Sequence, residues 1–221
     1  MMFPNWAKNI LFLLVYMISG LILVIIIEGL LSGTDLIPLN TAIESAVVHM
    51  RAPLLTSFLV LVTKISDPFL LSSLAVLIAA LLIMRRNVYD AVLFLSAIIV
   101  AIISLTVLKN IFQITRPVSD IYSANGWSFP SGHATVATAF FFLLSLTFFS
   151  RMKTAGRKVA LVLGSILAAV LISFSRLYLG AHWTLDILAG IALGLLSVSF
   201  TVLMFSVFVE NKRSLRNRIN S

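Results

Sequence analysis

The sequence predicts an all-α membrane protein with six transmembrane helices and a short interfacial helical segment between the first and second spans. Composition supports this fold class, because 60% of the 221 residues are hydrophobic and only 11% are charged, whereas soluble domains carry roughly 25% charged residues. The mean hydropathy is +1.10, and the apolar residues form runs long enough to cross a bilayer. Basic residues separate several of these runs, as in multi-span membrane proteins.

The first apolar run covers residues 10–31 and is interrupted only by Glu28 near its far end. A cleaved signal peptide has a shorter apolar core and a small-residue cleavage site, so we expect a retained first span. Residues 32–40 contain turn formers and Pro38 and are predicted to form a loop. Residues 41–50 then predict a short amphipathic helix on the outer membrane surface.

Residues 54–84 are apolar but are interrupted by Lys64, Asp67 and Pro68. Asp67 followed by Pro68 is typical of a helix start, with a capping residue and then proline at the first helical position. We therefore expect an interfacial or partly inserted helix before Lys64 and a true span over residues 68–84. The alternative is two short spans, each of which would be thin for a bilayer.

The remaining spans are predicted over residues 89–108, 134–149, 159–174 and 185–209. With this layout, one side of the membrane holds Lys8, the Arg85-Arg86 pair, the basic loop 151–158 and the tail 212–218. The positive-inside rule makes this side the cytoplasm, so both termini are predicted to be cytoplasmic in a plasma-membrane protein. We expect one integral-membrane domain over residues 1–221.

Net charge, cysteine content and glycine spacing limit the predicted binding partners, the possible chemistry and the packing of the helices. The formal net charge is +8, but the positive-inside rule explains it better than nucleic-acid binding, so no nucleic-acid partner is expected. The absence of cysteine excludes a disulfide framework and thiol catalysis. Gly190 and Gly194 predict close helix packing, either within the bundle or between protomers, which leaves the oligomeric state open.

The basic residues of the predicted outer face are not explained by orientation, and they surround a His–Asp pair. His182 and Asp186 are four residues apart, so on a helix they share one face. The carboxylate can then hold one imidazole nitrogen and leave the other free to react. Arg176 lies just upstream and supplies a permanently charged fork suited to phosphate oxygens.

A second histidine, His133, follows Ser131 and Gly132 at a predicted helix start. A hydroxyl cap and a bare glycine backbone at the positive end of a helix dipole form an anion site. Two histidines can divide the work of phosphoryl transfer, one attacking phosphorus and the other protonating the leaving oxygen. His182, with Asp186 behind it, is the better nucleophile, and His133 is then the acid.

These residues form three spaced motifs: Lys109 with Arg116-Pro117, Pro130-Ser131-Gly132-His133, and Ser175-Arg176 with His182 and Asp186. In order and spacing the motifs resemble the signature of the type 2 phosphatidic acid phosphatase superfamily. Three spaced motifs in the right order are far more specific than any single motif. The resemblance covers residues 109–186 closely. The six-span layout extends it, more loosely, to the whole chain.

The resemblance implies that His182 forms a phosphohistidine intermediate and that Asp186 orients and charges it. His133 would protonate the leaving group and then activate water. The residues implied in phosphate binding are Lys109, Arg116, Ser131, Gly132 and Arg176. No metal and no other cofactor is expected; a metal site built from Asp120, His133, His182 and Asp186 is the disfavoured alternative, because lysine and arginine charges adjoin it.

The expected function is a membrane lipid phosphatase with its active site near the outer surface. The implied substrates are undecaprenyl pyrophosphate, phosphatidylglycerophosphate and phosphatidic acid, so the expected partners are a lipid substrate and the bilayer. One alternative is a phosphotransferase of the same superfamily. Another is a transporter or flippase that binds lipid phosphate without cleaving it, although binding alone needs no oriented nucleophile.

Overall fold

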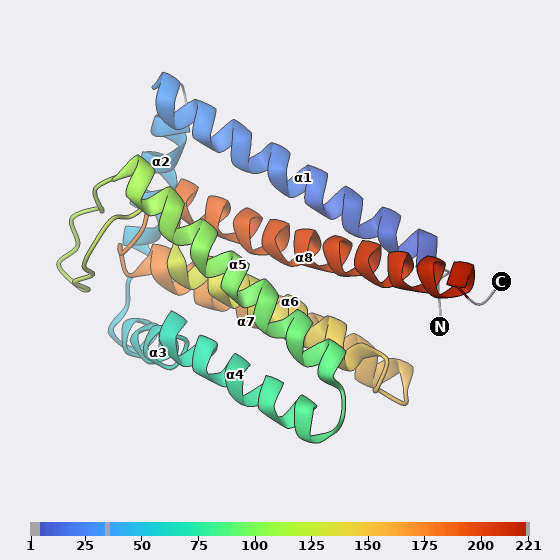
Figure 1. The fold of residues 1–221 in the computed structure, drawn as a ribbon. Coiled ribbons are helices and arrows are strands. Elements are labelled where there is room, and N and C mark those ends of the chain that lie inside the picture. The colour runs from blue at the N-terminus through green and yellow to red at the C-terminus, as the bar shows by residue number, and fades with distance from the viewer. Residues whose placement is uncertain (1–4, 34–35, 220–221) are drawn as a thin grey trace.

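The computed structural model describes residues 5–33 and 36–219, and these residues fold into a helical bundle that contains no β-strand (Figure 1). The all-α prediction is therefore confirmed. In chain order the helices are α1 (Asn5–Ser32), α2 (Leu36–His49), α3 (Pro53–Ile65), α4 (Pro68–Met84), α5 (Val88–Phe112), α6 (Gly132–Phe149), α7 (Ala155–Tyr178) and α8 (Thr184–Ile219).

The six-span prediction is also confirmed. Helices α1, α5, α6, α7 and α8 are each long and apolar enough to cross a membrane. Helices α3 and α4 pass the same test as a pair, bent by 47° at a short break, and counting this pair as one span, the second in chain order, gives six. Helix α2 is the short segment between the first and second spans, and it begins at Leu36 rather than at residue 41.

Several helices continue beyond the predicted spans. Helix α5 reaches Phe112 rather than ending at residue 108, and α7 reaches Tyr178 rather than residue 174. Helix α8 continues to Ile219, past the expected end at residue 209, although the basic side chains of the tail lie outside the described residues. Hydropathy marks the part of a helix that contacts lipid, whereas helical hydrogen bonding continues through polar turns.

The break in the second span lies where the sequence predicts a helix start. Asp67 caps α4 by accepting a hydrogen bond from the Phe69 backbone N–H at 2.9 Å, and Pro68 occupies the first turn. On the other side of the break, the backbone N–H and the hydroxyl of Ser66 donate to the Val62 carbonyl at 3.1 and 2.6 Å. Each side of the break therefore has a local capping contact.

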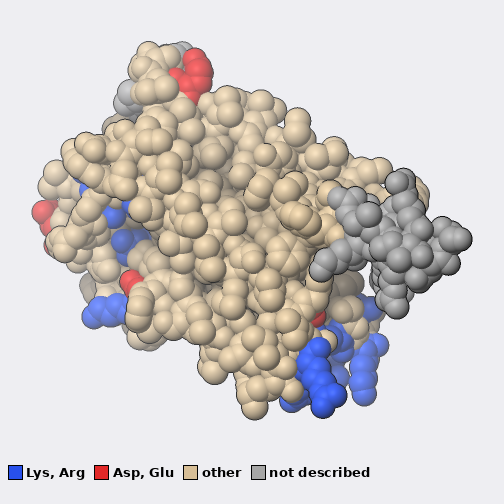
Figure 2. Space-filling view, in the orientation of Figure 1, with Lys and Arg blue, Asp and Glu red and all other residues tan. Residues whose placement is uncertain are grey.

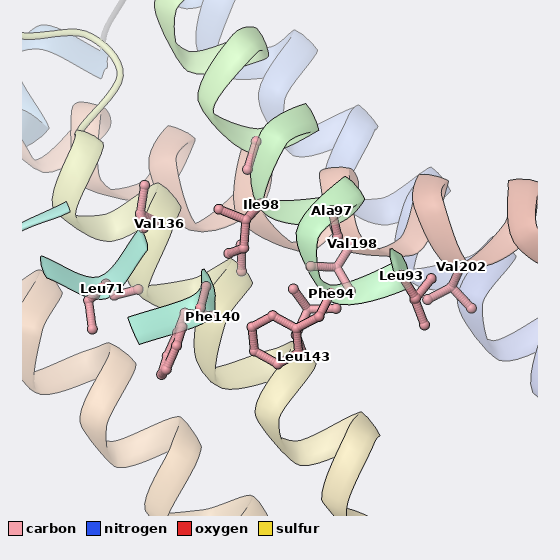
Figure 3. Close-up of a cluster of buried hydrophobic side chains, with 14 of the residues drawn as sticks. Leu71, Leu93, Phe94, Ala97, Ile98, Val136, Phe140, Leu143, Val198 and Val202 are labelled. Carbon is pink, nitrogen blue, oxygen red and sulfur yellow. The ribbon is translucent and has the colours of Figure 1, made fainter. Parts of the chain in front are cut away.

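The core lies where α5, α6 and α8 meet, with α4 and α7 packed around α6 and α1 along α8. Figure 3 shows the aromatic and aliphatic side chains of this cluster, including Phe94, Phe140, Leu143 and Val198, all of them buried. The rings of Phe94 and Phe140 meet edge to face, with their centroids 5.8 Å apart. In a bilayer, such interdigitation rather than exclusion of water holds helices together.

Gly190 and Gly194 let α8 approach α6 closely, so their packing lies within the bundle. A Cβ atom at Gly190 would lie 2.7 Å from the Ser131 carbonyl oxygen, and one at Gly194 would lie 2.7 Å from the Thr135 carbonyl oxygen. Both contacts are with backbone, which cannot move aside as a side chain does. This close approach sets the position of the start of α8 against the start of α6.

Charged side chains gather at the two ends of the bundle and leave a broad neutral surface between them (Figure 2). At one end, the exposed Arg85 and Arg86 lie in the α4–α5 turn. Arg151 of the α6–α7 loop forms an ion pair with Asp90 of α5 at 2.5 Å. The start of α1 and the end of α8 lie at this same end (Figure 1), whereas the α5–α6 and α7–α8 loops lie at the other.

We predict that Gly194→Ala destabilises the bundle by about 1–3 kcal/mol, because overpacking against backbone forces the helices apart. Thermal unfolding of the purified protein in detergent measures the change. Gly164→Ala is the matched control, because nothing lies within 4 Å of a Cβ at that position on α7. Equal melting temperatures for the two variants would contradict the prediction.

Candidate active site

The turn that ends α7 places His182 against the start of α8. Gly180 has φ +64°, a conformation that glycine adopts without strain. The Gly180 N–H donates to the Leu177 carbonyl, and the Ala181 N–H donates to the Arg176 carbonyl, both at 3.0 Å. This is a Schellman motif, and it reverses the chain within a few residues. His182 and Arg176 are thereby held close to each other by local structure.

Asp186 lies in the first turn of α8, and its buried carboxylate is the centre of a hydrogen-bond network. Its Oδ2 accepts from the Trp183 backbone N–H at 2.9 Å, as in half of a capping box, and also from the Ser128 hydroxyl. The Nδ1 of His182 lies 3.3 Å from the same oxygen. The Asp186 carbonyl accepts from the Ser131 N–H at 2.9 Å, which joins α8 to the start of α6.

The contacts of His182 define its tautomer. Its Nε2 lies 3.0 Å from Nη1 of Arg116, and a guanidinium group can only donate. Nε2 is therefore an acceptor with a lone pair, and Nδ1 carries the proton that it donates to Asp186. This is the arrangement that the sequence predicts for the pair, with one nitrogen held and the other presenting its lone pair.

Burial lowers the pKa of His182 well below its ordinary value of 6.5. The positive charges of Arg116, Arg176 and Lys109 lower it further, in that order. Both effects favour the neutral ring, because each penalises an additional positive charge in this part of the molecule. His182 is thus a neutral imidazole among three cations.

Arg116 joins the α5–α6 loop to the α7–α8 loop. Its Nη1 donates to the Ala181 carbonyl at 2.7 Å, in addition to its contact with His182. Its other donors reach the carbonyls of Asn125, Gly126 and Trp127 at 2.9–3.2 Å. Burial lowers the pKa of Arg116, and the charge of Arg176 adds to this effect, but an arginine remains protonated in proteins.

Lys109 approaches the same loop from the last turn of α5. Its Nζ donates to the Trp127 carbonyl at 2.5 Å and lies 3.4 Å from the Ser128 carbonyl. The contact with Ser128 places the ammonium group next to the residue that holds Asp186. Lys109 and Arg116 therefore hold the α5–α6 loop over the His–Asp pair through backbone carbonyls.

His133 and Arg176 meet at Thr63, near the end of α3. The Nε2 of His133 lies 3.3 Å from the Thr63 carbonyl oxygen, and Nη1 of Arg176 donates to the Thr63 hydroxyl at 2.6 Å. The guanidinium group of Arg176 also lies over the Tyr122 ring, 4.8 Å from its centroid. Arg176 is 2% exposed, so these contacts stabilise a charge that is almost fully buried.

Ser131 precedes α6, but the prediction that its hydroxyl caps this helix is wrong. Its side chain makes no capping hydrogen bond, and its backbone N–H instead donates to the Asp186 carbonyl at 2.9 Å. The buried Ser131 Oγ and Arg176 Nε are among the described atoms without a hydrogen-bond partner. Gly132 begins α6, and a Cβ there would make only ordinary contact with Leu105, so helix packing does not require glycine.

The structure thus brings the predicted residues to one end of the bundle and adds partners that the sequence analysis missed. Ser128 and Thr63 are the main additions, and no spacing rule marks either of them. Within the described residues, no three His, Cys, Asp or Glu side chains gather as a metal-binding group. Asp120 therefore does not join the histidines and Asp186 in the cluster that the metal alternative requires.

The fold and the site define a helical membrane protein in which a histidine, held by a carboxylate, lies among three cations at one end of the bundle. This chain belongs to the PAP2 superfamily, whose family model matches residues 90–210. It is 33% identical to phosphatidylglycerophosphatase B of Bacillus subtilis over 164 residues, which cover 71% of this chain and 78% of that protein. It is 29% identical to an undecaprenyl-diphosphatase of Sulfolobus acidocaldarius, over 75% and 78% of the two chains.

Solved structures agree with this assignment. The crystal structure of a transmembrane PAP2-type phosphatidylglycerolphosphate phosphatase from Bacillus subtilis superposes with a TM-score of 0.75 and 25% identity, covering 90% of this chain and 96% of that chain. The LpxE structure from Aquifex aeolicus matches with a TM-score of 0.61 and 24% identity, covering 74% of this chain and 94% of that chain, which supports the fold alone.

We predict that His182 is neutral and protonated at Nδ1 at about pH 6.5, where an ordinary histidine is half protonated, because its pKa is lowered well below that value. Nitrogen-15 NMR of histidine-labelled protein measures both properties. The chain has 3 histidines, so His182→Gln identifies the signal by its loss. An imidazolium signal for His182 at this pH would contradict the prediction.

Proposed function

We propose that this protein is an integral-membrane lipid phosphatase, formed by one domain over residues 1–221, that hydrolyses a terminal phosphate or pyrophosphate. The observation that carries the proposal is the neutral His182, whose Nε2 lone pair faces Arg116 while Nδ1 is held by Asp186. Such a nitrogen can act as a nucleophile, and the cations around it attract an anionic substrate. The relatives named above are phosphatases of phosphatidylglycerophosphate and of undecaprenyl diphosphate.

In the first step, Nε2 of His182 attacks phosphorus and the bond from phosphorus to the leaving oxygen breaks. The phosphoryl group replaces the contact between Nε2 and Arg116, and Arg116 then binds the phosphoryl oxygens. The ring gains positive charge as the N–P bond forms, and the Asp186 carboxylate stabilises this charge. Ser128 and the Trp183 N–H keep the carboxylate in position.

His133 serves the opposite side of the phosphoryl group. It donates a proton to the leaving oxygen, and the negative charge of the bound phosphate favours its protonated form. In the second step it removes a proton from water, whose oxygen attacks phosphorus and breaks the N–P bond. Inorganic phosphate then leaves, and both histidines return to their starting states.

The phosphate oxygens are held by the residues that the sequence motifs predict. Arg116 and Arg176 supply forked donors, and Lys109 supplies a further positive charge. The unpartnered Ser131 hydroxyl and the N–H groups that begin α6 at Gly132 supply neutral donors. Three cations against one carboxylate give the site a net positive charge, and the scheme assigns no step to a metal ion.

The position of the site suits a lipid substrate. The catalytic residues lie at the ends of spans, so a headgroup can reach them while its hydrocarbon chain remains in the bilayer. Undecaprenyl pyrophosphate, phosphatidylglycerophosphate and phosphatidic acid each carry a terminal phosphate of this kind. A phosphotransferase would share the first step and would replace water by an acceptor hydroxyl in the second.

We predict that the purified protein releases phosphate from at least one of these lipids in excess EDTA, and that His182→Gln lowers the rate more than about a thousandfold. Loss of the nucleophile removes the covalent route, whereas chelation leaves the histidines and cations intact. Phosphate release measures turnover, and base-stable protein-bound phosphate from a radiolabelled substrate measures the intermediate.

His49→Gln is the matched control for this experiment, because His49 is exposed on α2. It should retain wild-type turnover. Near-wild-type turnover by His182→Gln would contradict the proposed nucleophile. Loss of turnover in EDTA that returns with a divalent cation would contradict the metal-free scheme, and labelled His182 without phosphate release would favour a phosphotransferase.

We further propose that the site faces the outside of the cell and that both termini are cytoplasmic. The exposed Arg85 and Arg86 and the α6–α7 loop support this orientation through the positive-inside rule. The site lies at the opposite end of the bundle, with the α5–α6 and α7–α8 loops (Figure 1).

Because the chain contains no cysteine, single cysteines can report the orientation. We predict that a membrane-impermeant maleimide labels Ser123→Cys in intact cells and labels Ser150→Cys only after lysis. Both serines are exposed, one in the α5–α6 loop and one after α6. The reverse labelling pattern would contradict the proposed orientation.

A further inference from the structure

The break in the second span brings Thr63 into contact with two residues of the site. Thr63 is 1% exposed and lies in the last turn of α3, and neither its type nor its position belongs to the three motifs. Its hydroxyl accepts a hydrogen bond from Arg176, and its carbonyl lies within hydrogen-bond distance of His133. One residue of α3 thus joins residues of α6 and α7.

The carbonyl contact depends on the break itself. In a continuous helix the Thr63 carbonyl would accept from the N–H four residues later, at Asp67. Asp67 instead has non-helical backbone angles (φ −53°, ψ 137°) and caps α4, so the end of α3 leaves its last carbonyls without helical partners. His133 Nε2 donates to one of them. This bond fixes the proton on Nε2 and leaves Nδ1 as the nitrogen that exchanges a proton with the substrate.

The hydroxyl contact fixes Arg176. Its Nη1 is 2.6 Å from the Thr63 Oγ1, and its Nε has no partner among the described atoms. A buried guanidinium group can turn about its side-chain bonds unless its nitrogens are held. The Thr63 hydroxyl and the Tyr122 ring both contact it, which restricts the rotation of the group.

We propose that Thr63 is a positioning residue, which holds Arg176 through its hydroxyl and His133 through its carbonyl so that both meet the phosphate in a fixed geometry. The inference rests on the proposed function and extends it to the bent second span. Thr63 touches no reacting atom. It acts by reducing the rotational freedom of a cation and by selecting the tautomer of the proposed acid.

Thr63→Val tests the hydroxyl alone, because valine keeps the shape of the side chain and the backbone carbonyl. We predict that it weakens binding of orthovanadate, a phosphate-like anion, by roughly tenfold to a hundredfold, the range of a lost hydrogen bond to a charged group. Thr63→Ser restores the hydroxyl and should remain within about twofold of wild type. If the methyl group that takes the place of the hydroxyl in Thr63→Val prevents folding, Thr63→Ala removes the hydroxyl instead.

Two readouts separate positioning from general stability. The vanadate-dependent rise in melting temperature measures anion binding without turnover, and the Michaelis constant for a lipid substrate should rise by a similar factor. Thr106→Val is the matched control, because Thr106 is exposed on α5 and its hydroxyl only donates to the Ile102 carbonyl at 2.8 Å. It should leave both readouts unchanged.

Equal vanadate affinity in wild type and Thr63→Val would overturn the inference, as would equal loss in the serine and valine variants. If wild type binds vanadate but releases no phosphate from any lipid, the proposed function fails while the binding comparison still decides the role of Thr63. If wild type hydrolyses lipid and all Thr63 variants match it, the inference fails and the proposed function stands.

Discussion

The buried carboxylate of Asp186 is the interaction on which the arrangement of this end of the bundle depends. A buried carboxylate is costly unless it is paired and hydrogen-bonded. Its partners are Ser128 of the α5–α6 loop and His182 and Trp183 of the α7–α8 loop. The backbone carbonyl of Asp186 also accepts a hydrogen bond from the Ser131 N–H. Satisfying one charge therefore fixes two loops and two helix starts relative to each other.

The cations around this pair are held mainly by backbone carbonyls. Arg116 and Lys109 donate to the carbonyls of the α5–α6 loop, and Arg176 is held by a hydroxyl and an aromatic ring. Neutral acceptors orient a cation without cancelling its charge, so the site keeps a positive potential while its geometry is set. Placing fixed donors where negative charge develops is a general route to stabilising a phosphoryl transition state.

The bent second span shows why irregular backbone is tolerated at this depth. Free carbonyls at a helix break are unfavourable in lipid but acceptable where protein groups satisfy them. Asp67 and Ser66 make local capping contacts at the two helix ends, and His133 uses a carbonyl that the break leaves available. The break thus replaces one helical hydrogen bond with a contact to the site.

The sequence alone determined the fold class, the spans, the break at Asp67 and the motif residues, because hydropathy, capping and motif spacing are local properties of the chain. The tertiary structure decided that Gly190 and Gly194 pack within the bundle, that the Ser131 hydroxyl does not cap α6, and that Ser128 and Thr63 join the site. These contacts connect distant residues, such as Thr63 and Arg176, which are 113 positions apart. Their formation depends on how the helices pack, and no local pattern encodes that geometry.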